Sequence, residues 1–304
     1  MSIEIVGPEI EPKLDWIALT EAIVAGHALP RAEVADTLLY RGKDTLLTRS
    51  AWIDGLGLAV KAATIFPGNA SLGKPTVFGA VNLLSDKDGD LEALVDFRLV
   101  TKWKTAGDSL LAARQLARKG SERFLIVGAG TVARSMIEAY RAAFPQARLA
   151  VWSRSATSAR ELAAATGAEV VADLEAAVRR AHVIVTATMA TDPIIRGEWL
   201  KPGTHLDLIG AYKPGMRECD NDCMRLARVF VDSRATTVHH IGEIMDPIAE
   251  GAMTEADIVA DYYDLSSGRF ARRTDDEITI CKNGGGAHLD LMTARYILSV
   301  ARGL

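Results

Sequence analysis

Residues 123–133 read RFLIVGAGTVA, an apolar strand followed by a glycine-rich turn and the start of a helix. Gly128 to Ala133 fit the pattern G-x-G-x-x-G/A in the strand–turn–helix setting that makes this pattern informative. Gly128 permits the tight turn, Gly130 lets the backbone approach a pyrophosphate, and Ala133 is small enough for close packing of helix on strand. The helix N-terminus also attracts phosphate. We therefore predict a dinucleotide-binding site with contacts from Gly128, Ala129, Gly130, Thr131 and Val132.

Beyond this turn, apolar strands and helices alternate. The strand-like segments are ARLAVWS (147–153), HVIVTAT (182–188), GTHLDLIG (203–210) and ARVFVDS (227–233), with helical segments such as ATSARELAAATG (156–167) among them. Continuous apolar strands that alternate with helices indicate a parallel sheet covered on both faces. We expect an α/β fold with a Rossmann-type, doubly wound domain over residues 113–283.

The first hundred residues have a different pattern, in which short apolar runs are separated by turns rich in Gly, Pro and Asp. This pattern is typical of a strand-rich or α+β unit. TAGDSLLAARQLARKG (105–120) has the apolar stripe and the terminal glycine of a helix. The chain ends with a Gly-rich turn and a helix, which we expect to return to the first part. A substrate-binding and dimerisation domain of α+β type is thus predicted over residues 1–112 and 284–304.

Composition narrows the class of protein. A hydrophobic fraction of 49%, a charged fraction of 24% and a net charge of −4 are ordinary for a globular chain and give no indication of a nucleic-acid or membrane partner. No apolar run reaches the ~18–20 residues of a membrane helix, and the N-terminus lacks the pattern of a signal peptide. The three cysteines and the pair His239-His240 have no spacing that completes a metal site. We therefore expect no metal, reduced thiols and a cytoplasmic location.

The segment after the second Rossmann strand bears on the choice of cofactor. An NAD-selective site places Asp or Glu roughly 20–25 residues beyond the first glycine, where the carboxylate binds the ribose 2′-OH. This chain has Ser153-Arg154-Ser155 there and no acid. A guanidinium flanked by hydroxyls binds a 2′-phosphate, so the segment favours NADPH. A solvated arginine, with NADH still accepted, is the alternative.

Lys61 is the only charged residue between Asp54 and Lys74, within the apolar stretch GLGLAVKAATIFPGN. Burial of an ammonium costs several kcal/mol unless the group is paired or used in chemistry, and it lowers the pKa of the lysine. Two interpretations stay open: a lysine in a reaction site, or one at a strand end whose head reaches water. Arg49, twelve residues earlier, offers a fork for a carboxylate, although a surface arginine is the commoner case.

Several segments resemble the ornithine cyclodeaminase/mu-crystallin family, in the same order over nearly the whole chain. They are GLAVKAATIFPGN, GKPTVFGAVNLLSDKDG, TKWKTAGDSLLAARQLA, IVGAGTVARS, TATMATDPII, GAYKPGMRE and CKNGGGAHLDL. The resemblance implies a Rossmann domain and a second domain that binds substrate and forms a homodimer. It also implies one of the family's activities: ornithine cyclodeamination, alanine dehydrogenation, or reduction of cyclic ketimines such as Δ1-pyrroline-2-carboxylate.

The resemblance assigns roles to individual residues. Lys61 matches the family's active-site lysine, and Gly284 and Gly285 match the turn that closes over nicotinamide and substrate. His288 and Asp290 follow this turn; His288 either approaches the site or is structural, and Asp290 either caps the last helix or reaches the substrate nitrogen. The positions that match cofactor contacts are Thr76, Lys104, Thr105, Thr186, Thr188, Gly210, Ala211 and Tyr212.

Two positions depart from the family pattern. Cyclodeaminases have an acid/base aspartate where this chain has Tyr212, which disfavours cyclodeamination. The family's substrate-carboxylate arginine lies further upstream, where this chain has Asp36-Thr37. We predict Arg49 as its substitute, because the spacing between Arg49 and Lys61 resembles that of the alanine-dehydrogenase branch.

These observations predict an NADPH-preferring reductase of a small cyclic imino acid, Δ1-pyrroline-2-carboxylate or Δ1-piperideine-2-carboxylate, with L-proline or L-pipecolate as product. Arg49 would hold the carboxylate, Lys61 would hydrogen-bond the substrate and help keep its nitrogen protonated, and Gly285 would line the substrate. Three alternatives remain: an alanine-dehydrogenase-type enzyme, an ornithine cyclodeaminase, and a non-catalytic mu-crystallin-like binding protein.

Overall fold

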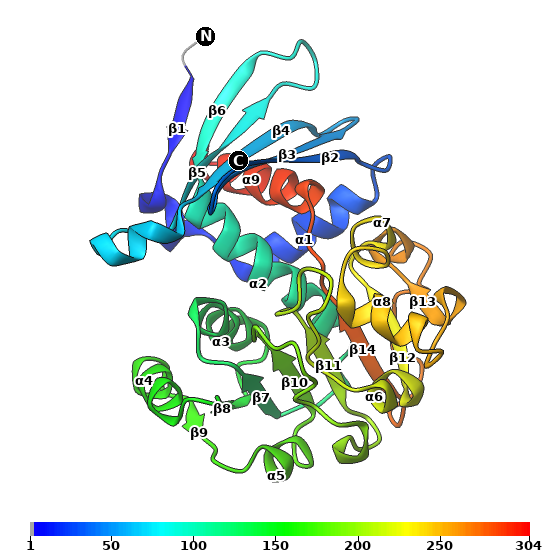
Figure 1. Ribbon diagram of the computed structural model, residues 1–304. Coiled ribbons are helices and arrows are strands. Elements are labelled where there is room, and N and C mark those ends of the chain that lie inside the picture. Colours follow the sequence, from blue (N-terminus) through cyan, green and yellow to red (C-terminus); the bar gives the residue numbers. More distant parts are fainter. Residues whose placement is uncertain (1–2) are drawn as a thin grey trace. The chain divides into compact units, whose positions relative to one another are not determined.

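The computed structural model describes residues 3–304, and the chain forms two compact units (Figure 1). Unit 1 contains the chain up to Lys104 together with Gly286–Leu304, and unit 2 contains Thr105–Gly285. The domain boundaries that we predicted after residues 112 and 283 fall close to these divisions but not at them. One helix, α2 (Phe97–Leu116), runs through the first division, so no Gly- or Pro-rich turn marks it in the sequence.

Unit 1 is built on a six-stranded sheet with the order β1-β6-β5-β4-β3-β2. Pairing is antiparallel except between β1 and β6, and the strands are β1 (Glu4–Val6), β2 (Glu33–Arg41), β3 (Asp44–Ile53), β4 (Gly57–Ile65), β5 (Val77–Leu84) and β6 (Leu91–Asp96). The C-terminal helix α9 (Ala287–Ala301) packs against strands of this sheet and against α1 (Trp16–His27). The last helix thus returns to the first part of the chain, as predicted. The 3-10 helices η1 (Pro8–Lys13) and η2 (Pro67–Leu72) complete the unit.

The pleat of β4 places Lys61 on the covered face of this sheet. Alternate residues of β4 point to opposite faces, and Ala59, Lys61 and Ala63 are buried while the residues between them are partly exposed. The two alanines are small, so they leave room for the long side chain of Lys61. Only 6% of Lys61 is exposed, so its head does not reach solvent.

The helix that we predicted over residues 105–120 is wrong at both ends. α2 begins at Phe97 and ends at Leu116. Asp96 ends β6, and its carboxylate accepts a hydrogen bond from Leu99 N at 2.7 Å, which starts the helix directly after the strand. The segment LEALVDFRLV resembles one apolar run in the sequence, so this cap was not apparent there.

Unit 2 contains an eight-stranded sheet with the order β13-β12-β14-β11-β10-β7-β8-β9. Its described pairings are parallel, and the strands are β7 (Arg123–Val127), β8 (Arg148–Trp152), β9 (Glu169–Val170), β10 (Val183–Thr186), β11 (His205–Leu208), β12 (Ala227–Val231), β13 (Ile258–Ala260) and β14 (Ile278–Lys282). The strand order reverses at β7, which lies between β8 and β10. Open α/β sheets bind ligands at the carboxyl ends of the strands at such a reversal.

Helices connect these strands: α3 (Thr131–Ala143), α4 (Ala156–Thr166), α5 (Leu174–Val178), α6 (Asn221–Leu226), α7 (Arg234–Thr237) and α8 (Gly242–Ala249), with the 3-10 turns η3 (Gly197–Trp199), η4 (Glu255–Asp257) and η5 (Tyr262–Asp264). All residues of β10 and β11 are buried, as in a sheet covered on both faces. The predicted α/β, Rossmann-type fold is confirmed.

Candidate active site

The glycine turn after β7 has the backbone that phosphate binding requires. Gly128 has φ +124°, and a Cβ there would lie 2.5 Å from the carbonyl oxygen of Ala187, so only glycine fits. Gly130 is the N-cap of α3 and receives no side-chain cap, and a Cβ on Gly130 would meet no described atom within 4 Å. The first N–H groups of α3 are therefore accessible to a phosphate.

The loop between β8 and α4 presents hydroxyls and one cation. Ser155 caps α4 by accepting a hydrogen bond from Ser158 N at 3.2 Å, and Ser153 Oγ accepts one from Ser155 N at 3.3 Å. Arg154 is exposed, and neither a hydrogen bond nor an ion pair joins it to another residue of the 3–304 range. Its guanidinium thus remains available to an anion at this edge of the sheet.

One buried carboxylate, which the sequence reasoning missed, holds the loops after β10 and β11. Glu218 accepts hydrogen bonds from Thr188 N at 2.8 Å and Thr188 Oγ1 at 2.7 Å, and from Gly210 N at 2.7 Å and Ala211 N at 3.3 Å. The segments TATMATDPII and GAYKPGMRE, which resemble the family's cofactor loops, are therefore joined through a single side chain. Gly210 allows this approach, because a Cβ there would lie 2.2 Å from Thr188 O.

A second buried carboxylate lies behind Glu218. Glu243 accepts hydrogen bonds from Glu218 N at 2.6 Å and from Cys219 N at 3.1 Å. Burial, together with the negative charge of Glu218, raises the pKa of Glu243 to about 7, although the charge of Lys282 opposes this shift. The Glu243 carboxyl group, which accepts from the backbone of Glu218 and Cys219, therefore titrates near neutral pH.

Asp232 plays the same part for the glycine turn after β14. Its carboxylate accepts hydrogen bonds from Gly284 N at 2.9 Å, Gly285 N at 2.5 Å and Thr237 Oγ1 at 2.7 Å. A Cβ on Gly284 would lie 2.4 Å from Thr237 Oγ1, so the turn is built for glycine. An acid directly after the apolar strand VFV is the sequence signal that could have indicated this role.

Two of the predicted cofactor residues, Thr186 and Tyr212, differ in their exposure. Thr186 is fully buried in β10, and its hydroxyl donates to Asp207 O at 3.4 Å, so a cofactor contact by Thr186 stays a prediction. The hydroxyl points into the sheet because Thr186 is still within the strand, whereas Thr188 lies beyond its end. Tyr212 is 56% exposed next to the Glu218-bound Ala211, and the ammonium of Lys213 lies 5.8 Å from its ring centroid.

In unit 1, Lys61 meets an acid from the other end of the chain. Its Nζ donates to Asp290 Oδ1 of α9 at 2.9 Å and to Thr101 Oγ1 of α2 at 3.1 Å, and it lies 4.8 Å from the ring centroid of Phe97. Asp290 is 1% exposed, and its Oδ2 is buried without a hydrogen-bond partner among residues 3–304. The side chain of Asp290 therefore pairs with Lys61, and Gly286 is the N-cap of α9.

Neighbouring positive charges lower the pKa of both groups of this pair, whereas burial acts on the two in opposite directions. Burial, assisted by the positive charges of Lys104 and Arg49, lowers the pKa of Lys61, and Asp290 only partly offsets this. Burial raises the pKa of Asp290, but the charges of Lys61 and Lys104 outweigh it and the net shift is downward. Asp290 is thus held as a carboxylate beside an ammonium that loses its proton more easily than an exposed lysine does.

Arg49 lies next to Lys61, but its fork is engaged. The two residues are paired across β3 and β4, and Asp36 is paired with Arg49 across β2 and β3. Arg49 donates from Nε to both Asp36 oxygens at 3.0 Å and from a terminal nitrogen to Oδ2 at 2.7 Å. The prediction that Arg49 offers its fork to a substrate carboxylate is therefore not met in this structure, because Asp36 holds it.

Lys104, predicted beside the cofactor phosphates, is buried in unit 1 and acts electrostatically on Lys61, Asp290 and His288. His288 is buried beside His27, with ring centroids 5.4 Å apart, and burial together with the electrostatic influence of His27, Lys104 and Arg49 holds its pKa well below the usual value. His288 is therefore neutral at pH 7. Thr76 precedes β5 of the same unit, and Thr105 opens unit 2.

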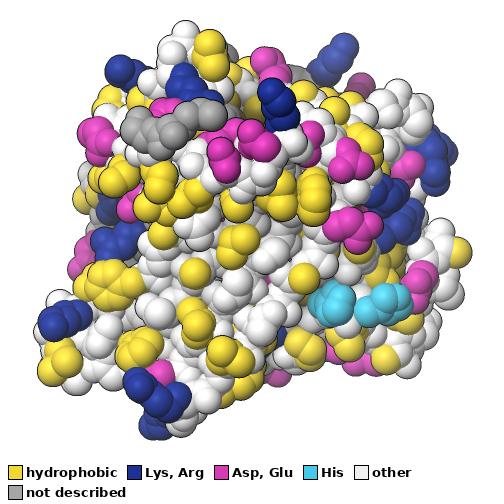
Figure 2. Space-filling view, turned by 90° about the horizontal axis from the view of Figure 1, so that it is seen from above, with side chains coloured by type: hydrophobic (Ala, Val, Ile, Leu, Met, Phe, Trp, Pro, Cys, Tyr) yellow, Lys and Arg dark blue, Asp and Glu magenta, His cyan; other side chains and the backbone are white. Residues whose placement is uncertain are grey.

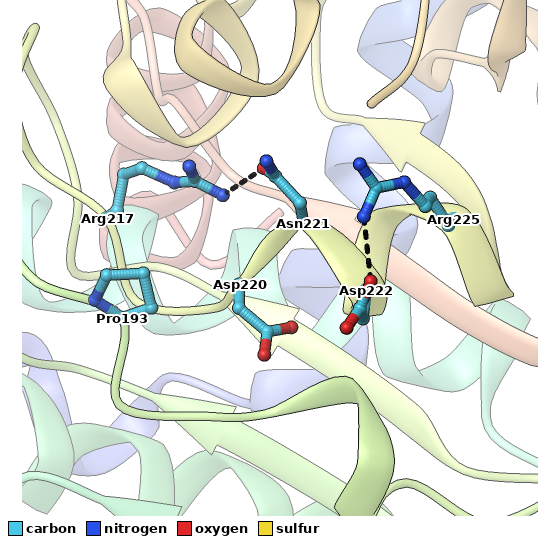
Figure 3. Close-up of a pocket in the computed structure, with 6 residues that line it drawn as sticks. All are labelled: Pro193, Arg217, Asp220, Asn221, Asp222 and Arg225. Carbon is cyan, nitrogen blue, oxygen red and sulfur yellow. Dashed lines mark hydrogen bonds and ion pairs between the residues drawn. The ribbon is translucent and has the colours of Figure 1, made fainter. Parts of the chain in front are cut away.

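A pocket of about 280 Å³ in unit 2 is lined by polar and charged side chains around α6 (Figure 3). Asp220 caps α6 through Cys223 N at 3.0 Å, Arg217 donates to Asn221 Oδ1 at 2.9 Å, and Arg225 pairs with Asp222 at 2.7 Å. These polar side chains hold the segment around α6 in place.

Among residues 3–304, no group of three His, Cys, Asp or Glu side chains is arranged to hold a metal ion. None of the helices of this range combines the length and the apolar character that a membrane crossing requires.

The fold and these two sets of residues define a Rossmann-type dinucleotide-binding protein with a buried lysine–carboxylate pair in a second unit. The sequence pattern of the ornithine cyclodeaminase/mu-crystallin family matches residues 51–303, and the chain belongs to this family. A Δ1-pyrroline-2-carboxylate reductase of Paracoccus denitrificans (strain Pd 1222) is 50% identical over 298 residues, which are 96% of this chain and 94% of that protein.

Solved structures agree with this assignment. The Thermococcus litoralis Δ1-pyrroline-2-carboxylate reductase in complex with NADH and L-proline superposes with a TM-score of 0.87 at 25% identity, over 99% of both chains. An archaeal alanine dehydrogenase dimer with bound NAD superposes with a TM-score of 0.89 at 28% identity, over 100% of this chain and 97% of that chain. This chain therefore shares its fold with each of the two solved proteins over at least 97% of either chain.

Proposed function

We propose that this protein is an NAD(P)H-dependent reductase of cyclic imino acids, which converts Δ1-pyrroline-2-carboxylate or Δ1-piperideine-2-carboxylate to L-proline or L-pipecolate. The observation that carries this proposal is the buried pair of Lys61 and Asp290, whose second carboxylate oxygen has no hydrogen-bond partner among residues 3–304. A buried carboxylate oxygen without a partner is costly unless a donor meets it during function. The N–H of a protonated ring imine is such a donor.

The residues of this pair have complementary tasks. Asp290 stabilises positive charge on the ring nitrogen, which makes C2 of the imine more electrophilic. Lys61 has a lowered pKa, so it can supply the proton that keeps the nitrogen charged. When bound, the reduced nicotinamide supplies the hydride that C2 accepts. The sum is one hydride and one proton added across the C=N bond.

Lys104 is the best candidate for the substrate carboxylate. It is a buried cation in the same charged group as Lys61 and Asp290, and no described residue pairs with it. Arg49 contributes positive charge but is held by Asp36. We therefore assign the carboxylate first to Lys104, with Arg49 as a second contact that requires Asp36 to yield.

The cofactor would be held by the glycine turn of α3, by the loops that Glu218 joins and by the turn that Asp232 holds. The structural relatives have NADH or NAD bound. For this chain we propose a preference for NADPH, with NADH accepted, because the available guanidinium of Arg154 follows β8 and no acid stands beside it.

The test is the loss of NADPH absorbance with Δ1-pyrroline-2-carboxylate, run beside NADH and beside pyruvate plus ammonia. Fast turnover of the cyclic imine and slow turnover of pyruvate plus ammonia are expected. The likeness to an alanine dehydrogenase favours the second reaction as the rival, and faster turnover of pyruvate plus ammonia would establish it. Absence of turnover in every arm would leave a binding protein.

We also propose a homodimer that forms through the outer face of the unit 1 sheet. Leu39, Leu46, Thr64 and Phe78 are in register across β2 to β5, and the three apolar members are 61%, 37% and 44% exposed. The view from above shows many hydrophobic side chains between the charged ones (Figure 2). Exposed apolar rows of this kind mark interaction surfaces, and a relative of the same fold is a dimer.

Buried free thiols at Cys219, Cys223 and Cys281 support a reducing, cytoplasmic compartment.

A further inference from the structure

A second cationic site lies at the amino-terminal edge of the unit 2 sheet. A pocket of about 180 Å³ is lined by the cationic or titratable side chains of Arg118, Arg123, Arg179, Arg180, His182 and Lys201. Its other described lining residues, Ala181 and Pro202 to Thr204, are uncharged, so none of the described residues that form its wall is acidic. This concentration of positive charge stands out in a chain whose net charge is −4.

Three of these six side chains have no hydrogen-bond or ion-pair partner among residues 3–304. Arg179 pairs with Glu175 at 2.8 Å, and Arg123 donates to Arg180 O at 2.5 Å and contacts His182. The side chains of Arg118, Arg180 and Lys201 make neither a hydrogen bond nor an ion pair within the described 3–304 range. Three unpaired cations beside a fourth repel one another, so the arrangement costs free energy unless an anion binds between them.

The pKa of His182 is affected by the same positive charges. Its Nδ1 accepts a hydrogen bond from Glu122 N at 3.0 Å, and the ring is part of the pocket wall. Burial lowers the pKa of His182, the charges of Arg123 and Arg118 lower it further, and only Glu122 acts in the other direction. A bound anion would reverse the effect of the arginines, so the pKa of His182 is a built-in reporter of occupancy.

The pocket is separate from the cofactor residues. Arg123 is the first residue of β7 and Gly128 follows its last, while His182 directly precedes β10 and Thr188 follows its end. β7 has five residues, so the two edges are about 15 Å apart at ~3.3 Å per residue. An anion at Arg123 and His182 is therefore not the pyrophosphate of the dinucleotide.

We propose that this pocket binds a small oxyanion of the phosphate class, as free phosphate or as the phosphate of a small ester. The guanidinium groups of Arg118 and Arg180 offer planar forks that match phosphate oxygens, and Lys201 adds a point charge. The site is independent of the reaction proposed above, and β7 and β10 connect it to the loops that follow these strands.

The test is calorimetric titration of the full chain, saturated with NADPH so that its own phosphate contacts are filled, with inorganic phosphate and separately with glycerol 3-phosphate. One anion per chain is expected. Arg118→Gln, Arg180→Gln and Lys201→Gln should each weaken binding about tenfold, the loss of one charge-assisted contact. Lys119→Gln is the matched control, because Lys119 is an exposed cation next to Arg118 that does not line the pocket, and it should change affinity less than about twofold.

The nuclear magnetic resonance signal of His182, assigned with His182→Gln, gives an independent readout. Saturating phosphate should raise the pKa of His182 in the parent protein and leave it unchanged in Arg118→Gln/Arg180→Gln. Tighter binding of glycerol 3-phosphate than of phosphate would identify an ester, and equal binding would identify free phosphate. The proposal fails if millimolar phosphate gives no heat, if the three pocket variants bind like the parent, or if Lys119→Gln weakens binding as much as they do.

Discussion

At the scale of single residues, the proposed chemistry depends on Lys61 and Asp290. Neither is accessible enough to act as a surface ion pair, and each is the other's counter-ion within unit 1. A pair of this kind contributes little net stability, yet removal of one member leaves a buried charge without compensation. Replacement of one member and replacement of both members therefore have different effects on stability, and this difference distinguishes a structural role of the pair from a chemical one.

We predict that Asp290→Ala lowers the free energy of unfolding by about 3–5 kcal/mol, because Lys61 is then buried alone. Lys61→Met/Asp290→Leu, which replaces both charges by apolar groups of similar volume, should recover most of this loss. Both variants should lose imine reduction, as measured by NADPH oxidation. Recovery of stability with activity intact would contradict the proposed chemistry.

Lys61→Ala tests the lysine by itself. The variant should bind NADPH like the parent in a fluorescence titration, because Lys61 belongs to unit 1 and the glycine turn to unit 2. Turnover should fall at least 100-fold, the size typical of a lost general acid. Turnover at the parent level would show that Lys61 does not take part in the reaction.

The proposed preference for NADPH depends on Arg154. Arg154→Gln should raise the KM for NADPH about tenfold or more and leave the KM for NADH nearly unchanged, because only NADPH has the 2′-phosphate. Arg196→Gln, at another exposed arginine of unit 2, serves as the matched control. An equal effect on both cofactors would mean that Arg154 contributes only general positive charge.

At the scale of elements, the ends of β10, β11 and β14 matter more than the helices. Each end continues into a loop that is held by a buried carboxylate, Glu218 for the first two strands and Asp232 for the third. Backbone N–H groups that lie beyond a strand have no sheet partner, so a carboxylate is an efficient acceptor for several of them.

Glu218→Gln should loosen the loops that contain Thr188 and Gly210. The amide nitrogen of glutamine cannot accept from an N–H group, so at least one loop loses its acceptor. We expect a higher KM for NADPH, by about tenfold, with a smaller change in the KM for the imine. Glu169→Gln, an exposed acid on β9, should leave both constants unchanged.

Glu243 predicts a pH dependence of stability. Its pKa of about 7 in the folded chain lies above its ordinary value, so between about pH 4.5 and 7 the folded state binds more protons than the unfolded state. Stability therefore falls as the pH rises through this window, by up to about 3 kcal/mol from this group. In Glu243→Gln this contribution should vanish, which urea unfolding at pH 5 and pH 8 would detect as a smaller difference.

At the scale of the whole molecule, the exposed apolar row of the unit 1 sheet predicts assembly. Leu39→Glu/Phe78→Glu places two charges on this face without touching the covered face that contains Lys61. Light scattering should give a dimer for the parent and a monomer for the variant. A dimer in both would mean that the copies meet elsewhere.

Much of this molecule is determined by local sequence. The turn at Gly128, the strands of unit 2 and the isolated position of Lys61 among apolar residues are properties of short segments, because glycine conformation and strand periodicity depend on near neighbours. The absence of an acid around Arg154 is likewise visible in the sequence alone.

The partners of the charged groups, by contrast, depend on the tertiary structure. Asp290 lies 229 positions from Lys61, Asp36 takes the fork of Arg49 through strand register, and Glu218 joins two loops that the sequence separates. The cationic pocket likewise collects Arg118, Arg180 and Lys201 from three connections of the sheet. Such pairings follow from strand order and from packing at long range, and neither propensity nor periodicity encodes which distant charge will face which.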